Sequence, residues 1–336
     1  MANETLLFDT MLKHQVKLER FKLWMIETFH AELNQLRPII RAELIPYDLD
    51  TLTLGRFKQL RDRVVRAVSK HGEKIKARLI ELLVRFIGVE YETNIRIWDE
   101  VSRLLAEDDD EAGGVILSYL PTGDAWVGQI DADPIPALGE TWRAIVDAFF
   151  NAVLSRVYTQ LTTSYLTKVK TKDAIEAVVG GAATNYKTGS LPIILRQATS
   201  MLDTIIQSIG TRTQSAVQRA TRLPWADPPP NAAEGQGADP TPPPGSGSGQ
   251  NPGNRTAPVG SRCYIWISVL DGRTTIYCRN QNGRIYVYGF GPLPPAHPHC
   301  RSTIMPFVVG QTSRRVAANE IDVSRPLSLD DYSDAA

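Results

Sequence analysis

Two cysteines and one histidine near the C-terminus carry the side chains that zinc prefers. Cys278, His297 and Cys300 offer two thiols and an imidazole, and zinc takes such ligands in a tetrahedral shell of four. A fourth ligand is not obvious from the sequence. The candidates nearest in the sequence are Asp271, His299 and Cys263. We therefore expect no bound metal and buried, reduced cysteines; a zinc ion held by the three residues is the alternative, and a disulfide or a reactive thiol is a third.

The surroundings of this set do not indicate an enzyme. No Asp or Glu is placed beside it as an obvious general base. The chain also has no phosphate loop, no His-Glu-x-x-His and no Gly-x-Ser-x-Gly. His14, His30 and His71 fall in helical patterns without partners at metal-ligand spacing, so we interpret them as ordinary helix residues. We expect that the protein is not an enzyme.

A small sheet is predicted to position the cysteines and the histidine. Aromatic and β-branched residues alternate between two faces over 264–269, as in a strand. A turn is predicted at 271–272, and a second strand pattern covers 284–288. Prolines exclude a central strand in the segment that follows, so 291–302 should be a stiff, extended loop. These patterns predict a small α+β domain over 260–336.

Aromatic side chains are frequent in the same stretch. Such a set could stack single-stranded bases, but it more often lies half in the core and half on the sheet surface, which is the interpretation we favour. Its members are Tyr264, Trp266, Tyr277, Tyr286, Tyr288 and Phe290.

The order and spacing of these residues resemble the C-terminal domain of the phage Mu F-like minor head proteins, also called the phage head-morphogenesis family. In that family a Trp-containing strand leads into an Asp-x-Arg-Thr turn and a cysteine; a glycine-marked strand, a proline-rich loop and His-x-x-Cys-Arg follow. The matching residues here are Trp266, Asp271, Arg273, Thr274, Cys278, Gly283, Pro294, Pro295, His297, Cys300, Arg301 and Ser302. A weaker likeness upstream covers Phe8 to Phe21 and Arg212-Thr213-Gln214, where relatives carry Arg-Thr-Glu.

The resemblance also bears on the metal. Some relatives carry further cysteines where this chain has Thr275 and Ser302, in a pattern similar to a metal knuckle, so two strong ligands are absent here. At the turn, Asp271 and Arg273 are interpreted as a local ion pair that fixes the loop; the alternative is that Arg273 contacts a partner protein or a phosphate. The residues to which we assign a structural role are Trp266, Asp271, Arg273, Thr274 and Arg301.

The resemblance implies a minor head protein of a tailed bacteriophage, which binds the portal protein during prohead assembly and assists DNA packaging or ejection. Major capsid or scaffolding proteins and the packaged DNA are the further partners that it implies. The protein would be assembled in the host cytoplasm and would lie inside the capsid of the virion. The alternatives are a metal-dependent enzyme or effector carried in the capsid, and a DNA-binding module.

Residues 1–223 are predicted to form a helical docking domain. Apolar residues recur at steps of three and four over 1–37, 54–106, 137–169, 172–179 and 191–222. Between the second and third of these, the composition is loop-like. Ten prolines and six glycines among residues 224–259 predict a disordered linker. The predicted fold class is therefore mainly α, with long amphipathic helices followed by a disordered Pro/Gly-rich linker and a small α+β C-terminal domain.

The formal charge is balanced, with 37 Lys and Arg against 37 Asp and Glu, so bulk charge does not indicate a nucleic-acid binder. Its distribution is uneven, since 108–140 has eight acidic and no basic residues, and 141–223 has ten basic and four acidic. We interpret this as a solvated acidic loop beside a basic helix face; docking to a charged partner is the alternative. With no N-terminal signal, no long apolar run and only three cysteines, we expect no membrane contact and a reducing cytoplasm.

Overall fold

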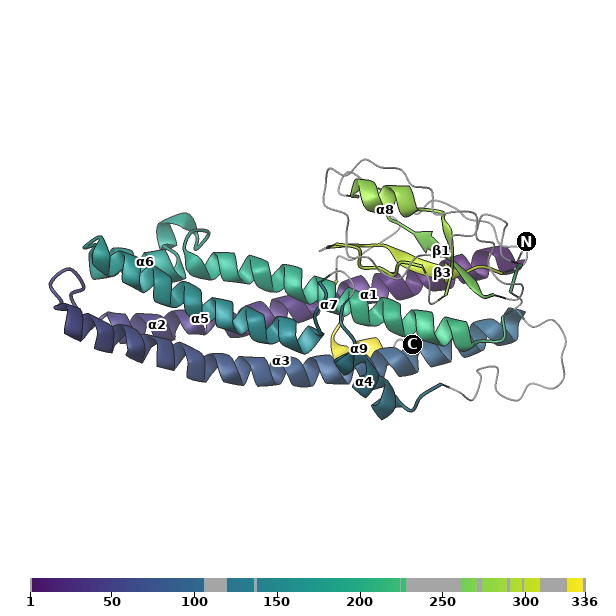
Figure 1. Ribbon diagram of the computed structural model, residues 1–336, viewed down its shortest axis with the longest axis horizontal. Coiled ribbons are helices and arrows are strands. Elements are labelled where there is room, and N and C mark those ends of the chain that lie inside the picture. The colour runs from purple at the N-terminus through teal and green to yellow at the C-terminus, as the bar shows by residue number, and fades with distance from the viewer. Residues whose placement is uncertain are drawn as a thin grey trace. The chain divides into compact units, whose positions relative to one another are not determined.

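The computed structural model describes residues 2–105, 120–135, 138–223, 225–227, 261–270, 274–288, 291–297, 299–308 and 325–334. Most of these residues are helical, and a small antiparallel sheet of three strands lies near the C-terminus (Figure 1). The predicted fold class, mainly α with a small α+β C-terminal part, is confirmed. Of the predicted linker, only 225–227 belongs to the described residues. None of the described helices combines the length and the apolar character that a membrane span requires.

The chain divides into two compact units, which we call the helical unit and the sheet unit. The helical unit comprises Met25–Leu83 and Trp142–Leu202, and the sheet unit comprises Met1–Trp24, Val84–Thr141 and Asp203–Ala336. The sheet unit therefore combines the strands with parts of three long helices. The division into domains 1–223, 224–259 and 260–336 stays a prediction.

The helical unit contains α2 (Leu36–Leu44), α5 (Trp142–Leu166), α6 (Thr171–Val179), the short 3-10 helix η1 (Ala182–Thr184) and parts of α1 (Ala2–Asn34), α3 (Leu54–Leu105) and α7 (Ser190–Ala220). Its core is rich in aromatic residues. The rings of Phe57 and Tyr165 stack with centroids 4.0 Å apart. Pro38 lies in the first turn of α2, where its missing amide costs no helical hydrogen bond, so the helix runs on to Leu44.

Glycine makes the turn between α6 and α7 possible. Gly180 follows α6 with a φ of 90°, and a Cβ at this position would lie 2.6 Å from the carbonyl oxygen of Thr188. Gly189, with a φ of 104°, directly precedes α7. Residues with a Cβ rarely adopt such positive φ values, so glycine is required at these two positions. The two glycines separate α6 from α7, as the sequence predicts.

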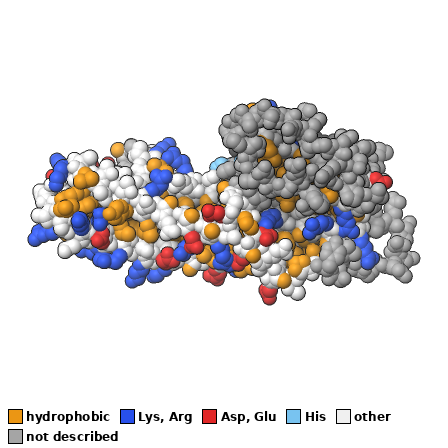
Figure 2. Space-filling view, in the orientation of Figure 1, with side chains coloured by type: hydrophobic (Ala, Val, Ile, Leu, Met, Phe, Trp, Pro, Cys, Tyr) orange, Lys and Arg blue, Asp and Glu red, His pale blue; other side chains and the backbone are white. Residues whose placement is uncertain are grey.

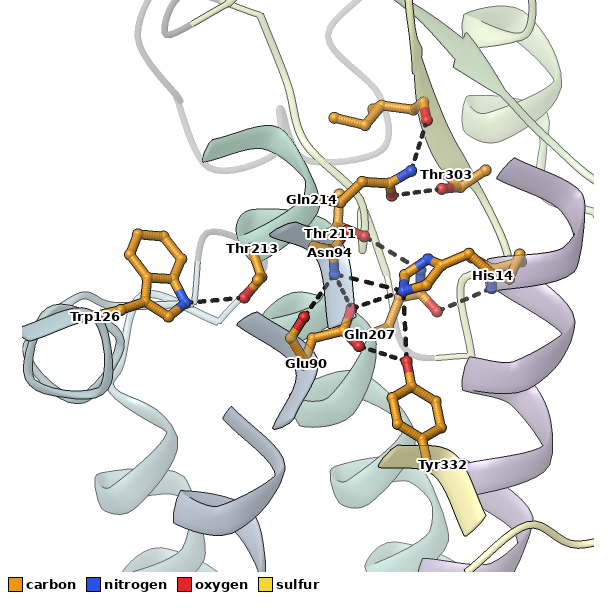
Figure 3. Close-up of polar contacts among 12 residues, drawn as sticks. His14, Glu90, Asn94, Trp126, Gln207, Thr211, Thr213, Gln214, Thr303 and Tyr332 are labelled. Atoms are coloured by element: carbon orange, nitrogen blue, oxygen red, sulfur yellow. Dashed lines mark hydrogen bonds and ion pairs between the residues drawn. The ribbon is translucent and has the colours of Figure 1, made fainter. Parts of the chain in front are cut away.

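In the sheet unit, α4 (Gly123–Ala132) corrects a prediction, because the sequence composition predicts a loop for this stretch. Thr122 caps the helix, since its hydroxyl accepts a hydrogen bond from an amide of the first turn. Buried Trp126 donates from Nε1 to Oγ1 of Thr213 at 3.1 Å (Figure 3). The loop prediction is wrong for 123–132 because a cap and one anchored tryptophan stabilise a helix that composition alone does not indicate.

The sheet has the order β2-β1-β3, and both pairings are antiparallel. Its strands are β1 (Cys263–Ile267), β2 (Ile285–Val287) and β3 (Thr303–Pro306). Helix α8 (Ile276–Gln281) connects β1 to β2 and is not predicted by the sequence pattern. The hydrophobic cluster between these elements consists of Tyr264, Trp266, Cys278, Tyr286, Tyr288, Cys300 and Ile304. The cysteines of interest therefore belong to the core of the sheet unit.

A row of glutamines on α7 holds the edge strand β3. Gln207 donates from Nε2 to the carbonyl oxygen of Ser302 at 3.1 Å, and Gln214 donates to that of Ile304 at 3.2 Å. Thr303 donates from Oγ1 to Oε1 of Gln214 at 3.1 Å (Figure 3). These side chains satisfy polar groups that an edge strand leaves without a strand partner. The last part of α7 is thus an integral support of the sheet.

A buried polar network anchors the C-terminal helix α9 (Leu329–Asp334) to α1 and α3 (Figure 3). Nε2 of His14 lies 3.0 Å from Oε1 of Glu90, and the Tyr332 hydroxyl donates to the other oxygen of that carboxylate. Asn94 donates to Oε1 of Glu90 at 2.9 Å. All four side chains are buried. The interpretation of His14 as an ordinary helix residue is therefore incomplete, because its partners come from segments distant in the sequence.

Candidate metal centre

Helix α8 and the loop between β2 and β3 bring Cys278, His297 and Cys300 together. Cys278 lies in the first turn of α8, which begins after Thr275; the Thr275 hydroxyl caps the helix by accepting the amide of Cys278 at 3.3 Å. His297 lies in the proline-rich loop after β2, and Cys300 lies three residues before β3. The amide of Cys300 donates to the carbonyl oxygen of His297 at 3.2 Å, which folds this loop back on itself.

The three side chains lie close enough together to share a metal ion, although the sulfur–nitrogen distance is that of a hydrogen bond. Sγ of Cys278 lies 3.0 Å from Nε2 of His297 and 3.7 Å from Sγ of Cys300. All three ligand atoms lie within 4.8 Å of one another. With Zn–S bonds of about 2.3 Å, tetrahedral geometry separates two sulfur ligands by about 3.8 Å. The Cys-His-Cys group that the sequence suggests can therefore hold a metal ion.

The described residues supply three ligands and a polar surround for a fourth position. The Thr275 hydroxyl lies 2.9 Å from Nε2 of His297. Of the suggested fourth ligands, His299 pairs with Asp203, Cys263 contacts the Ser261 carbonyl, and Asp271 lies outside the described residues. A small pocket opens beside the group and is lined by Val269, Thr274, Thr275, Cys278, His297, His299, Arg301 and Ser302. A metal with three protein ligands would keep a position here for water.

The two central cysteines share a proton. The hydrogen bond from Cys278 lowers the pKa of the Cys300 thiol to about 5, although burial opposes this. The same bond and burial raise the pKa of Cys278. Cys263 differs, because burial raises the pKa of its thiol to about 11. Since metals bind the thiolate form, Cys300 is well suited as a ligand, whereas Cys278 would lose its proton on binding a metal; Cys263 lies outside the group.

A buried hydroxyl connects the structural residues of the sequence motif to the cysteines. Trp266 donates from Nε1 to the hydroxyl of Ser268 at 2.9 Å, and Ser268 donates to the carbonyl oxygen of Cys278 at 2.8 Å. The hydroxyl of Ser302 lies 2.9 Å from that of Ser268. Ser268 thus positions α8 relative to the loop before β3, a role that its place in the sequence does not reveal.

The remaining motif residues lie around the same pocket or outside the described residues. Thr274 donates from its hydroxyl to the carbonyl oxygen of Val269, and Arg301 lines the pocket. Asp271 and Arg273, for which we predict a local ion pair, lie outside the described residues.

A buried lysine of α1, Lys22, supports the loop between β2 and β3, and the sequence does not indicate this role. Nδ1 of His299 lies 2.8 Å from Asp203, whose other oxygen lies 3.1 Å from Nζ of Lys22. Burial by itself lowers the pKa of Lys22, but the carboxylates of Asp203 and Glu19 outweigh burial and raise it. Lys22 therefore remains a cation inside the sheet unit. This role depends on contacts between residues that are far apart in the sequence, from Lys22 to Asp203 and from Asp203 to His299.

The aromatic set is mostly core. Tyr264, Trp266, Tyr286 and Tyr288 are buried, whereas Tyr277 is 42% exposed and Phe290 lies outside the described residues. Buried rings cannot stack on bases, so these side chains favour the structural interpretation over single-strand binding.

No protein-family model matches the chain, and neither the search of curated proteins nor that of solved structures found a match.

Proposed function

We propose that this chain is a minor head protein of a tailed bacteriophage, without enzymatic activity, that binds the portal protein during prohead assembly and assists DNA packaging or ejection. Its further partners are major capsid or scaffolding proteins and the packaged DNA. It is assembled in the host cytoplasm and lies inside the capsid of the virion.

One observation carries this proposal. The residues on which the family resemblance rests are spread over more than thirty positions of the sequence, and several of those within the described residues gather in one place. Trp266, Cys278, His297 and Cys300 share the core or its rim, and Arg301 lines the same pocket. A set of residues that matches a family motif by chance has no reason to form one connected centre.

Portal binding is tested by co-expression of the full-length chain with the portal protein of the phage that encodes it. We expect the chain to copurify with portal and to be present in proheads assembled with it. The portal protein of an unrelated phage is the control. Absence of the chain from proheads, together with no copurification, would refute the head role.

We further propose that Cys278, His297 and Cys300 bind zinc. The sequence led us to expect no metal, because Thr275 and Ser302 stand where some relatives have cysteines. The grouping of the three ligand atoms within 4.8 Å, the 3.7 Å between the two sulfurs and the low pKa of Cys300 favour zinc instead. With an open fourth position, bound zinc can hold water; its main effect here would be to tie α8 to the loop before β3, so that metal affinity adds to folding stability.

Elemental analysis of full-length, untagged protein tests the zinc site. We expect one zinc per chain, lost in Cys278→Ser, His297→Ala and Cys300→Ser. Cys263→Ser is the matched control, because Cys263 is another buried free cysteine but lies outside the group. Zinc that is absent from the wild type, or that is lost equally in Cys263→Ser, contradicts the assignment.

A further inference from the structure

The balanced charge of the chain conceals a strong difference between its two units. The helical unit contains 18 Lys and Arg against 11 Asp and Glu, a formal net charge of +7. The rest of the chain contains 19 against 26, a net charge of −7. A surplus of this size on a unit of 120 residues (Met25–Leu83 and Trp142–Leu202) indicates an anionic partner.

The surplus is concentrated on one face of α3, which we call the basic stripe. It consists of Arg56, Arg63, Arg66, Lys70, Lys74 and Arg78. These residues follow one another at steps of seven, three, four, four and four, so a helix places them along one side. All six are exposed, and Figure 2 shows Lys and Arg side chains gathered over this part of the molecule. At 1.5 Å per residue the stripe is about 33 Å long.

Neighbouring carboxylates neutralise only part of the stripe. Arg63 pairs with Glu43, and Arg78 pairs with Glu32. Within the described residues, no carboxylate lies at ion-pair distance from the other four basic residues. These four are Arg56, Arg66, Lys70 and Lys74. Asp62 and Glu73 are helical neighbours of Arg66 and Lys70, but they pair with Arg61 and Lys76 instead. Among the described residues, these four cations of α3 therefore have no ion-pair partner.

We propose that the basic stripe binds the phosphate backbone of double-stranded DNA, independently of base sequence. Duplex DNA carries about one charge per 1.7 Å of its axis, and one turn is about 34 Å long, close to the length of the stripe. The stripe itself is made of Lys and Arg, with exposed Gln59 and Ala77 beside it, as expected for backbone contacts. No exposed large hydrophobic side chain lies between Arg56 and Arg78. A protein interface normally has an apolar or aromatic centre, so DNA fits this surface better than an acidic protein does.

This surface deepens the proposed function, which already includes packaged DNA as a partner, and it rests on that proposal for the source of the DNA. It lies on α3 within the helical unit, whereas the metal centre belongs to the sheet unit. A failure of portal binding would leave DNA binding untouched, and the reverse also holds.

Fluorescence anisotropy with a labelled duplex of about 30 base pairs tests the proposal on the full-length chain. Four phosphate contacts predict a slope near −3.6 for the logarithm of the binding constant against that of salt concentration, or about a 100-fold loss of affinity between 50 and 200 mM salt. The stripe variant carries Arg56→Gln, Arg66→Gln, Lys70→Gln and Lys74→Gln. It should lose almost all of this slope, and Lys70→Gln alone should reduce it by about 0.9.

A control variant removes the same total charge from exposed positions outside the stripe. It carries Lys13→Gln, Lys58→Gln, Lys172→Gln and Arg222→Gln. We expect its salt slope to match that of the wild type, with circular dichroism showing that both variants fold. If the salt slope falls equally in both variants, DNA binding depends on the total charge of the chain and not on the basic stripe, and the proposal is overturned. So would salt-independent binding, no binding at all, or a stripe variant that changes only self-association.

Discussion

Removal of a single hydroxyl from Tyr332 should destabilise the sheet unit. Tyr332→Phe keeps the ring, which lies 5.4 Å from that of Phe21 and 5.8 Å from that of Phe86, measured between centroids. It removes the donor to the buried carboxylate of Glu90. A hydrogen bond to a charged, buried acceptor contributes about 1.5–3 kcal/mol, and we expect the free energy of unfolding to fall by that amount.

Tyr332→Ala should cost more, because it also removes the ring from a fully buried site. Large-to-small substitutions of buried aromatic residues cost about 3–5 kcal/mol. This loss exceeds that of Tyr332→Phe, and the difference between the two variants isolates the contribution of ring packing. Both losses should also loosen α9, since Tyr332 and Leu329 are its buried residues among those described.

Urea unfolding followed by circular dichroism measures these free energies, and hydrogen exchange of the α9 amides measures the loosening of the helix. Tyr158→Phe is the control, because Tyr158 is 42% exposed and its ring, which Arg61 covers at 4.2 Å, is retained. That variant should change stability by less than about 0.5 kcal/mol. If Tyr332→Phe is no less stable than Tyr158→Phe, the Glu90 network does not hold α9 and the reasoning fails.

Four further results are expected. Lys22→Met should cost about 3–5 kcal/mol at pH 7, because it leaves the buried carboxylate of Asp203 without its cation. The folded state raises the pKa of Lys22 above 10.5, so the stability that the Lys22 cation contributes is complete below that pH and is lost as the pH rises further. In a pH series of unfolding, the difference in stability between Lys22→Met and the wild type should therefore shrink above pH 10.5. Gln214→Ala should cost about 1–3 kcal/mol in urea unfolding by leaving polar groups of β3 unpaired; an unchanged midpoint would contradict its supporting role. Gly180→Ala should destabilise by more than about 1 kcal/mol, whereas Gly128→Ala, with open space around it, should be neutral or stabilising. Limited proteolysis should cut first within 228–259, and initial cleavage inside a helix would count against the predicted linker.

The sequence by itself determined the elements whose signals are local. Steps of three and four between apolar residues predict the long helix over 54–106, which the structure has as Leu54–Leu105. Alternation predicts the first strand over 264–269, and the structure has it as Cys263–Ile267. The chemistry of thiols and imidazole was enough to single out Cys278, His297 and Cys300. Periodicity and ligand type depend only on neighbouring residues, so one sequence suffices to recognise them.

Tertiary structure alone decided how these elements are used. The sequence does not predict α8, and without its first turn Cys278 would not lie 3.7 Å from Cys300. In the sequence, Gln207 and Gln214 are only polar positions on a predicted helix, but in the structure they donate hydrogen bonds to backbone carbonyls at the edge of the sheet. His14 reads as an ordinary helix residue, yet Glu90 and Tyr332 bury it in a polar network. In each case the partner is far away along the chain, and the free energy of burial and hydrogen bonding depends on spatial neighbours that no local pattern encodes.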